Sequence, residues 1–222
     1  MKLLEGNALL LRFNKDDNTR ARQLYEESIA LDAKNLTSYI DLAWTHLFDA
    51  SYGWSESRSR SLEAAYELAQ KALSIDESYA GIYATLGSIH LQKGEMKEAL
   101  ALRQKAVALE PNSANYHGQL GTTYLFMGGR TDEAIAELKN AIRLDPFPPA
   151  WALHCLGTAY RVNGEYDKAV QYFKKAVKNN PNYWLSYLEL SASYGLTGRE
   201  EEARTAAAEV LRIDPNFSIK KQ

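Results

Sequence analysis

The chain has 222 residues, of which 45% are apolar and 24% charged, a composition typical of a folded protein with a substantial core. Its 26 basic and 28 acidic residues are spread along the whole length, for a formal net charge of -2. Neutralising phosphates requires a concentrated positive surface, so we expect no nucleic-acid partner. Charges interrupt every apolar run well before the roughly 18 residues that a membrane span needs, so we expect no span.

Two features bear on the compartment. The single cysteine, Cys155, excludes an intrachain disulfide framework and favours a reducing environment. The first segment looks superficially like a signal peptide, but Glu5 and Arg12 interrupt it and no small-residue cleavage site follows. We therefore expect a cytoplasmic protein whose first segment is a helix.

A pattern of turn sequences and helical segments recurs along the chain. Turn sequences begin at residues 31, 75, 109, 144, 179 and 213, so successive starts differ by 44, 34, 35, 35 and 34 residues. Each turn follows an Ala-rich segment whose apolar residues recur three and four apart, as one face of a helix requires. A second segment of similar length precedes it, and turns such as KGEM at 93 and NGEYD at 163 separate the two. The repeating unit is therefore helix, tight turn, helix.

This spacing resembles the tetratricopeptide repeat, in which small and aromatic residues stand at fixed positions of two helices. The best copy of the pattern carries Ala150, Leu153, Leu156, Gly157, Tyr160, Ala169, Phe173, Ala176 and Pro181. The resemblance implies an all-α fold, a right-handed α-solenoid of about five to six helix-turn-helix units in one domain. The units run over residues 2–35, 36–79, 80–113, 114–149, 150–183 and 184–217.

Two segments depart from this regularity. The second unit is ten residues longer than most, and we place the excess in an inserted loop at residues 50–61, whose Tyr52 and Trp54 pack back on the solenoid or contact a partner. At the end of the last unit, Phe217 and Ile219 resemble the opening of a capping helix that is cut short. We therefore expect the chain to be a piece of a longer protein.

A finer resemblance rests on three stretches: LLLRFNKDDNTRARQLYEESIALD, DLAWTHLFDASYGWSES and PFPPAWALHCLGTAY. They resemble the repeat region at the C-terminal end of some bacterial class III adenylate or guanylate cyclase-like regulators. The resemblance implies the regulatory or assembly arm of a bacterial signalling protein, with an output domain elsewhere.

Catalytic and metal chemistry finds no support in the sequence. His46 and His90 occupy a repeat position held elsewhere by tyrosine, and His117 occupies an aromatic position, so packing explains all three. Ring and thiol of the neighbouring His154 and Cys155 point about 100° apart on a helix, which rules out a nucleophile and base pair. Metal-ligand and phosphate-binding motifs are missing as well. We predict no enzyme activity, no metal and no cofactor.

The family resemblance implies a partner groove along the exposed face of each first helix. Few basic residues stand at these positions, so we expect a protein or peptide partner with an apolar face, and Trp44, Trp151 and Arg161 as anchors. The predicted partner-binding residues are Ile40, Trp44, Leu47, Phe48, Asn115, Thr122, Phe126, Trp151, His154, Thr158, Arg161 and Leu188.

The predicted function is therefore a protein-interaction scaffold. One alternative is self-assembly into dimers or head-to-tail homo-oligomers through the open ends of the solenoid. Another is an RNA-binding helical repeat, which the charge balance disfavours.

Overall fold

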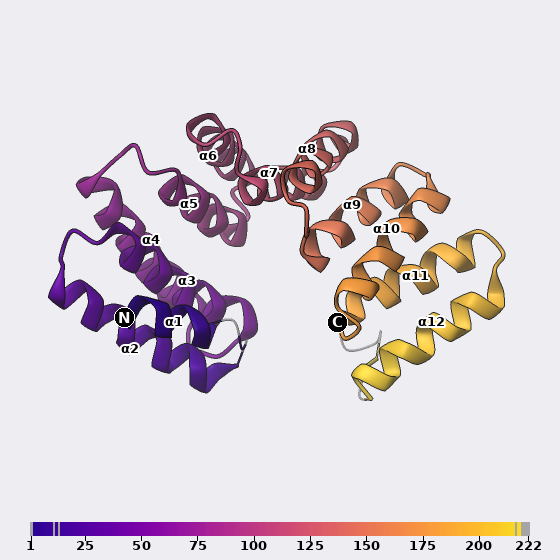
Figure 1. The fold of residues 1–222 in the computed structure, drawn as a ribbon, viewed down its shortest axis with the longest axis horizontal. Helices are drawn as coiled ribbons and strands as arrows, with labels where there is room; N and C mark the ends of the chain where they lie inside the picture. Colours follow the sequence, from indigo (N-terminus) through magenta and orange to yellow (C-terminus); the bar gives the residue numbers. More distant parts are fainter. Residues whose placement is uncertain (1, 11, 13, 216, 219–222) are drawn as a thin grey trace. The chain divides into compact units, whose positions relative to one another are not determined.

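The computed structural model describes residues 2–10, 12, 14–215 and 217–218, and these form twelve α-helices without a β-strand (Figure 1). The all-α prediction is confirmed. The helices are α1 (Lys2–Leu10), α2 (Lys15–Leu31), α3 (Leu36–Tyr52), α4 (Arg58–Ile75), α5 (Ala80–Lys93), α6 (Met96–Leu109), α7 (Ala114–Met127), α8 (Thr131–Leu144), α9 (Ala150–Val162), α10 (Tyr166–Asn179), α11 (Trp184–Leu196) and α12 (Glu200–Ile213). None of these described helices is long and apolar enough to cross a lipid bilayer.

The helices gather into two compact bodies where the sequence predicts one domain. The N-terminal body comprises residues 1–111 with α1 to α6, and the C-terminal body comprises residues 112–222 with α7 to α12. In a repeat protein each unit contacts only its neighbours, so compactness is a local property of a few stacked units.

Each predicted unit contains one pair of helices, and small residues let the two approach. In the pair α9 and α10, a Cβ added to Gly157 would lie 2.6 Å from Cε1 of Phe173, whose side chain is fully buried. Gly121 and Leu138 repeat this contact in the pair α7 and α8. Glycine at this position is therefore required by the close approach of the two helices.

The prediction that residues 50–61 form an inserted loop is wrong, because most of these residues belong to helices. Helix α3 continues to Tyr52 and α4 begins at Arg58, so the extra residues lengthen the two helices and leave a connection of residues 53–57. Gly53 ends α3 in the left-handed region with φ 66°, and the Ser57 side chain accepts the backbone N–H of Arg60 to begin α4. The sequence pattern misses this because both helices keep their period through the added turn.

The curvature of each body follows from which helices touch. In the N-terminal body α1 contacts α3 and α3 contacts α5; in the C-terminal body α7 contacts α9 and α9 contacts α11. Consecutive second helices make no such contact over the part of the chain described. The first helices therefore form the tighter side of each body, which we call its first-helix face.

At the end of the last pair, Phe217 is half-buried, with its ring centroid 5.4 Å from that of Trp184. Ile219, the other residue of the predicted cap, lies outside the described residues.

Candidate partner-binding surface

The first-helix face of the C-terminal body carries a row of exposed apolar side chains. Phe126 is 63% exposed, Val162 55% and Leu196 60%. All three occupy the thirteenth position of successive repeats, in the last turns of α7, α9 and α11. We call this row the apolar stripe. Sequence reasoning identified Phe126 alone, although the shared repeat position was a signal that would have found Val162 and Leu196.

One turn earlier, the same helices present small side chains beside the stripe. Thr122, Thr158 and Ala192 occupy the ninth position of their repeats. The Thr122 hydroxyl donates to the carbonyl of Gly118 at 2.8 Å, and that of Thr158 to the carbonyl of His154 at 3.1 Å. These hydroxyls are satisfied within their own helices, so this part of the face does not require a polar partner.

The charges on this face are already paired. Nε of Arg161 on α9 lies 2.5 Å from Oε2 of Glu189 on α11, and their side chains are 30% and 22% exposed. Arg161 was predicted as a cationic anchor for a partner, but its guanidinium already has a carboxylate. Glu189, which sequence reasoning did not select, thus belongs to the face and makes it nearly neutral.

Trp151 and His154 are held by packing within the body. A Cβ added to Gly118 would lie 2.6 Å from Cη2 of Trp151, so the indole lies directly against α7. Nδ1 of His154 is 3.0 Å from the hydroxyl of Ser186. Burial, and then the charge of Arg161, lowers the pKa of His154 to about 4, so its ring is neutral at pH 7.

The other two predicted partner-binding residues of this body, Asn115 and Leu188, do not belong to the apolar stripe. Asn115 is exposed at the start of α7, as expected. Leu188 lines an apolar groove of about 420 Å³ between α11 and α12, together with Leu211 and Phe217.

The N-terminal body has a different surface, an aromatic row along α3. The ring centroids of Trp44 and Phe48 are 5.8 Å apart, those of Phe48 and Tyr52 6.2 Å, and those of Tyr52 and Trp54 5.1 Å. Tyr52 is 54% exposed and the other three are half-buried. Trp54 therefore packs against Tyr52 at the end of α3, while Tyr52 itself stays largely exposed.

Two residues of this body that were predicted to bind a partner are buried in the core. Ile40 is 6% exposed and Leu47 0%, and both belong to the hydrophobic core between α3, α4 and α5. Their expected presence on the binding surface is wrong, because the neighbouring pair covers that side of α3.

The titratable groups considered for catalysis take part in packing. His117 is 9% exposed with Nδ1 2.5 Å from Oε2 of Glu137, and Nδ1 of His90 is 2.5 Å from Oε2 of Glu95. Burial lowers the pKa of His46 to about 4. Nowhere in residues 2–10, 12, 14–215 and 217–218 do three or more His, Cys, Asp or Glu gather as metal ligands would.

The Cys155 side chain is half-buried. Burial raises the pKa of its thiol, although a side-chain hydrogen bond with Thr122 opposes the shift. A raised pKa lowers the thiolate fraction and with it the reactivity of the sulfur.

Stacked helix pairs with close glycine contacts, and a first-helix face in each body, define an α-helical repeat protein of the solenoid class. Family models of the tetratricopeptide repeat match residues 58–122, 114–148, 150–183 and 186–217, which is well over half of the chain. The chain belongs to the tetratricopeptide repeat family, whose members commonly mediate protein–protein interactions.

Relatives of known function match only part of this chain. A stretch of 63 residues is 38% identical to a peroxisomal targeting signal receptor of Candida glabrata and covers 28% of this chain and 11% of the receptor. A stretch of 88 residues is 32% identical to anaphase-promoting complex subunit 3 of Schizosaccharomyces pombe and covers 39% of this chain and 13% of that subunit. The matched region is thus a small fraction of either relative.

Solved structures share the fold over almost the whole chain. A chain of the APC/C hetero-tetramer Cut9–Hcn1 superposes with a TM-score of 0.77 at 23% identity, covering 91% of this chain and 38% of its own. PilF of Pseudomonas aeruginosa superposes with a TM-score of 0.71 at 17% identity, covering 97% of this chain and 91% of its own. At these identities the likeness is one of fold.

Proposed function

We propose that this protein is an interaction scaffold that holds an amphipathic helix of a partner protein on the first-helix face of the C-terminal body. The apolar stripe of Phe126, Val162 and Leu196 carries this proposal, because three large apolar side chains stand more than half exposed at one position of consecutive repeats.

The spacing of the stripe favours a helical ligand. Packed helices lie about 8–10 Å apart, so the stripe side chains recur at about that distance. On an α-helix, residues seven apart lie on one face and are separated by about 10.5 Å along the axis. A partner helix that crosses α7, α9 and α11 with apolar residues at this interval would match the stripe. The satisfied threonines and the Arg161–Glu189 pair beside it suit an uncharged ligand face.

The test compares capture of a partner from the native lysate by the wild type and by a stripe variant, Phe126→Ser with Val162→Thr and Leu196→Ser. Leu31→Ser is the matched control, because Leu31 is 78% exposed on the second helix α2. We expect one defined protein to be lost with the stripe variant and kept with Leu31→Ser, while circular dichroism shows both folded. Equal capture by all three proteins would remove the stripe as the binding site.

A second candidate is self-assembly, supported by the apolar groove beside α12. Leu211 is 51% exposed there, and Leu188 and Phe217 line the same groove. A second copy that covered it would give a heterologous contact able to propagate. Light scattering should then show a mass that rises with concentration and returns to 25.0 kDa in Leu211→Glu. A monomeric wild type at all concentrations would exclude this role.

We also propose a cytoplasmic, non-catalytic role as the regulatory or assembly arm of a bacterial signalling protein. The reducing environment favoured by a lone cysteine and the resemblance to cyclase-like regulators support it. Cell fractionation with antibody detection, together with the mass of the native product, tests both parts. A secreted or membrane-bound product without an output domain would contradict the proposal.

A further inference from the structure

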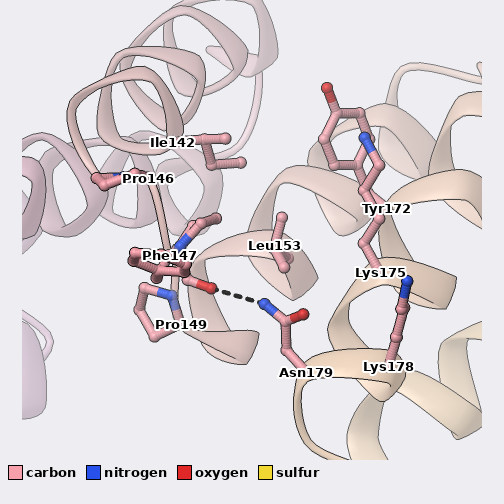
Figure 2. A pocket seen from close by; sticks show the side chains of 10 residues that line it. Ile142, Pro146, Phe147, Pro149, Leu153, Tyr172, Lys175, Lys178 and Asn179 are labelled. Atoms are coloured by element: carbon pink, nitrogen blue, oxygen red, sulfur yellow. Dashed lines mark hydrogen bonds between the residues drawn. The ribbon is translucent and has the colours of Figure 1, made fainter.

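A groove on the second-helix side of the C-terminal body is built differently from the first-helix face. It has a volume of about 670 Å³ and lies between α8 and α10, with the segment of residues 145–149 along one edge (Figure 2). The backbones of α8 and α10 make no contact over the described chain, so the space between them stays open. Residues of the apolar stripe do not line it.

One edge of the groove is a rigid, apolar segment. Three of the six prolines of the chain, Pro146, Pro148 and Pro149, lie in this connection. The Phe147 N–H donates to Oδ1 of Asp145 at 2.8 Å, and Nδ2 of Asn179 on α10 donates to the Pro148 carbonyl at 3.0 Å. The segment is therefore tied at both sides, and proline restricts its backbone further.

Phe147 is presented to solvent by this rigid segment. Its side chain is 87% exposed, more than any other large apolar side chain among the described residues. The dashed bond from Asn179 in Figure 2 marks where the segment is attached to α10, with Phe147 beside it. A large apolar group fixed in an exposed position loses little entropy when a partner covers it.

The opposite edge of the groove is cationic. Lys175 and Lys178 line it from α10, and Figure 2 shows both on the side away from Phe147. Both are exposed, and neither has a carboxylate within ion-pair distance in the described chain. Helix α10 as a whole carries four lysines and one aspartate. This edge is therefore a local positive surface on a chain of net charge -2.

From these two edges we infer that the groove binds an extended acidic peptide segment of another protein, with carboxylates on the lysines and an apolar side chain against Phe147. Lys175 and Lys178 stand three apart on one helix face, about 5–6 Å between Cβ atoms. Alternate residues of an extended chain are separated by about 6.6 Å, so two acidic residues flanking one other reach both lysines. Successive side chains of an extended chain point to opposite faces, so the residues that alternate with the two acidic ones face Phe147 and Pro149 on the other edge.

Single-stranded nucleic acid is a weaker fit to this groove. Stacking of bases requires free aromatic faces, but the Tyr172 ring is engaged by Tyr160 at 5.5 Å and by Nζ of Lys175 at 4.7 Å. Two lysines also provide little charge for a phosphate backbone. Charge complementarity with a short acidic peptide therefore explains the groove better.

The test uses fluorescence anisotropy of a labelled peptide in which two glutamates alternate with serine and precede leucine and phenylalanine. A matched peptide carries glutamine in place of each glutamate. We expect saturable binding of the acidic peptide, at least about tenfold weaker binding of the glutamine peptide, and a loss of affinity between about 50 and 500 mM salt. Absence of saturable binding, or equal binding of both peptides, would overturn the inference.

Variants then locate the site. Lys178→Glu and Phe147→Ser should each weaken binding about tenfold, and both residues are exposed, so folding is unaffected. Lys174→Glu is the control, because Lys174 is exposed on the same helix but does not line the groove. Equal losses of peptide affinity in Lys174→Glu and Lys178→Glu would show that the peptide responds only to the overall charge of α10. That result would refute the groove as its binding site.

Two further measurements distinguish peptide binding in this groove from binding at the apolar stripe and from binding of nucleic acid. The stripe variant should bind the acidic peptide as the wild type does, so failure of the first-helix proposal leaves this one testable. A single-stranded RNA that binds more tightly than the peptide and is lost with Lys178→Glu would reassign the groove to nucleic acid.

Discussion

Replacing Gly157 by alanine tests the idea that helix approach, and not backbone freedom, explains the glycines of the repeat. The new methyl carbon would lie 2.6 Å from Cε1 and 2.7 Å from Cδ1 of Phe173. The Phe173 side chain is 0% exposed, so the ring can move aside only by displacing the side chains around it. The pair α9 and α10 must therefore separate or the ring must leave its preferred rotamer.

Two opposing effects set the magnitude. Overpacking a core by one methyl costs about 1–3 kcal/mol and occasionally more. Alanine is the better helix former by about 1 kcal/mol. Because the phenyl ring is enclosed, we take the upper end of the first range and expect a net loss of about 2 kcal/mol in the free energy of unfolding. With a urea m-value of about 2 kcal/mol/M, the midpoint falls by about 1 M.

Urea unfolding followed by circular dichroism and by tryptophan fluorescence measures this shift. Repeat arrays can unfold in parts, so the m-values of wild type and variant must agree before the midpoints are compared. Gly195→Ala is the matched control, because Gly195 is also helical but a Cβ there has nothing within 4 Å. It should leave the midpoint unchanged or raise it.

The double variant Gly157→Ala with Phe173→Leu provides a rescue. With the smaller side chain in place, adding the alanine methyl should cost less than it does beside the phenyl ring. A midpoint for Gly157→Ala equal to or above that of the wild type would refute the close-approach reasoning.

Three further outcomes are expected in the C-terminal body. Arg161→Ala should lower the free energy of unfolding by about 1–2 kcal/mol, because it leaves the Glu189 carboxylate unpaired, and adding Glu189→Gln should recover most of the loss. NMR titration should give His154 a pKa of about 4; since the unfolded chain binds this proton near pH 6.5, stability should fall as pH drops from about 6.5 to 4. A measured pKa of 6 or above would contradict the burial of the ring. Cys155 should react with a thiol reagent at least about tenfold more slowly in the native protein than in urea, and equal rates would contradict the raised pKa of its thiol.

Much of the fold could be predicted from the sequence because its determinants are local. The helix pairs follow from apolar spacing and from turns that recur about every 34 residues. The contact between Gly157 and Phe173 also follows, since both belong to one pair whose geometry the repeat pattern already specifies. The error at residues 50–61 has the same origin, because a helix lengthened by a whole turn keeps the pattern of its faces.

The binding surface could not be predicted in the same way. Periodicity places a side chain on a face of its own helix, but burial depends on what the neighbouring pair brings against that face. Leu47 and Phe126 were both assigned to the partner face, yet the structure buries Leu47 and exposes Phe126. The ion pair of Arg161 with Glu189 joins different repeats, and so no property of either segment alone could reveal it.

The sequence by itself therefore determined the repeat, its helix pairs and the family, all of which arise from interactions within about 34 residues. Only the tertiary structure decided which side chains remain exposed, which charges are already neutralised, and that Phe147 and Lys178 lie on opposite edges of one groove. Those properties depend on side chains from separate repeats being brought together, and stacking of the helix pairs is what brings them there.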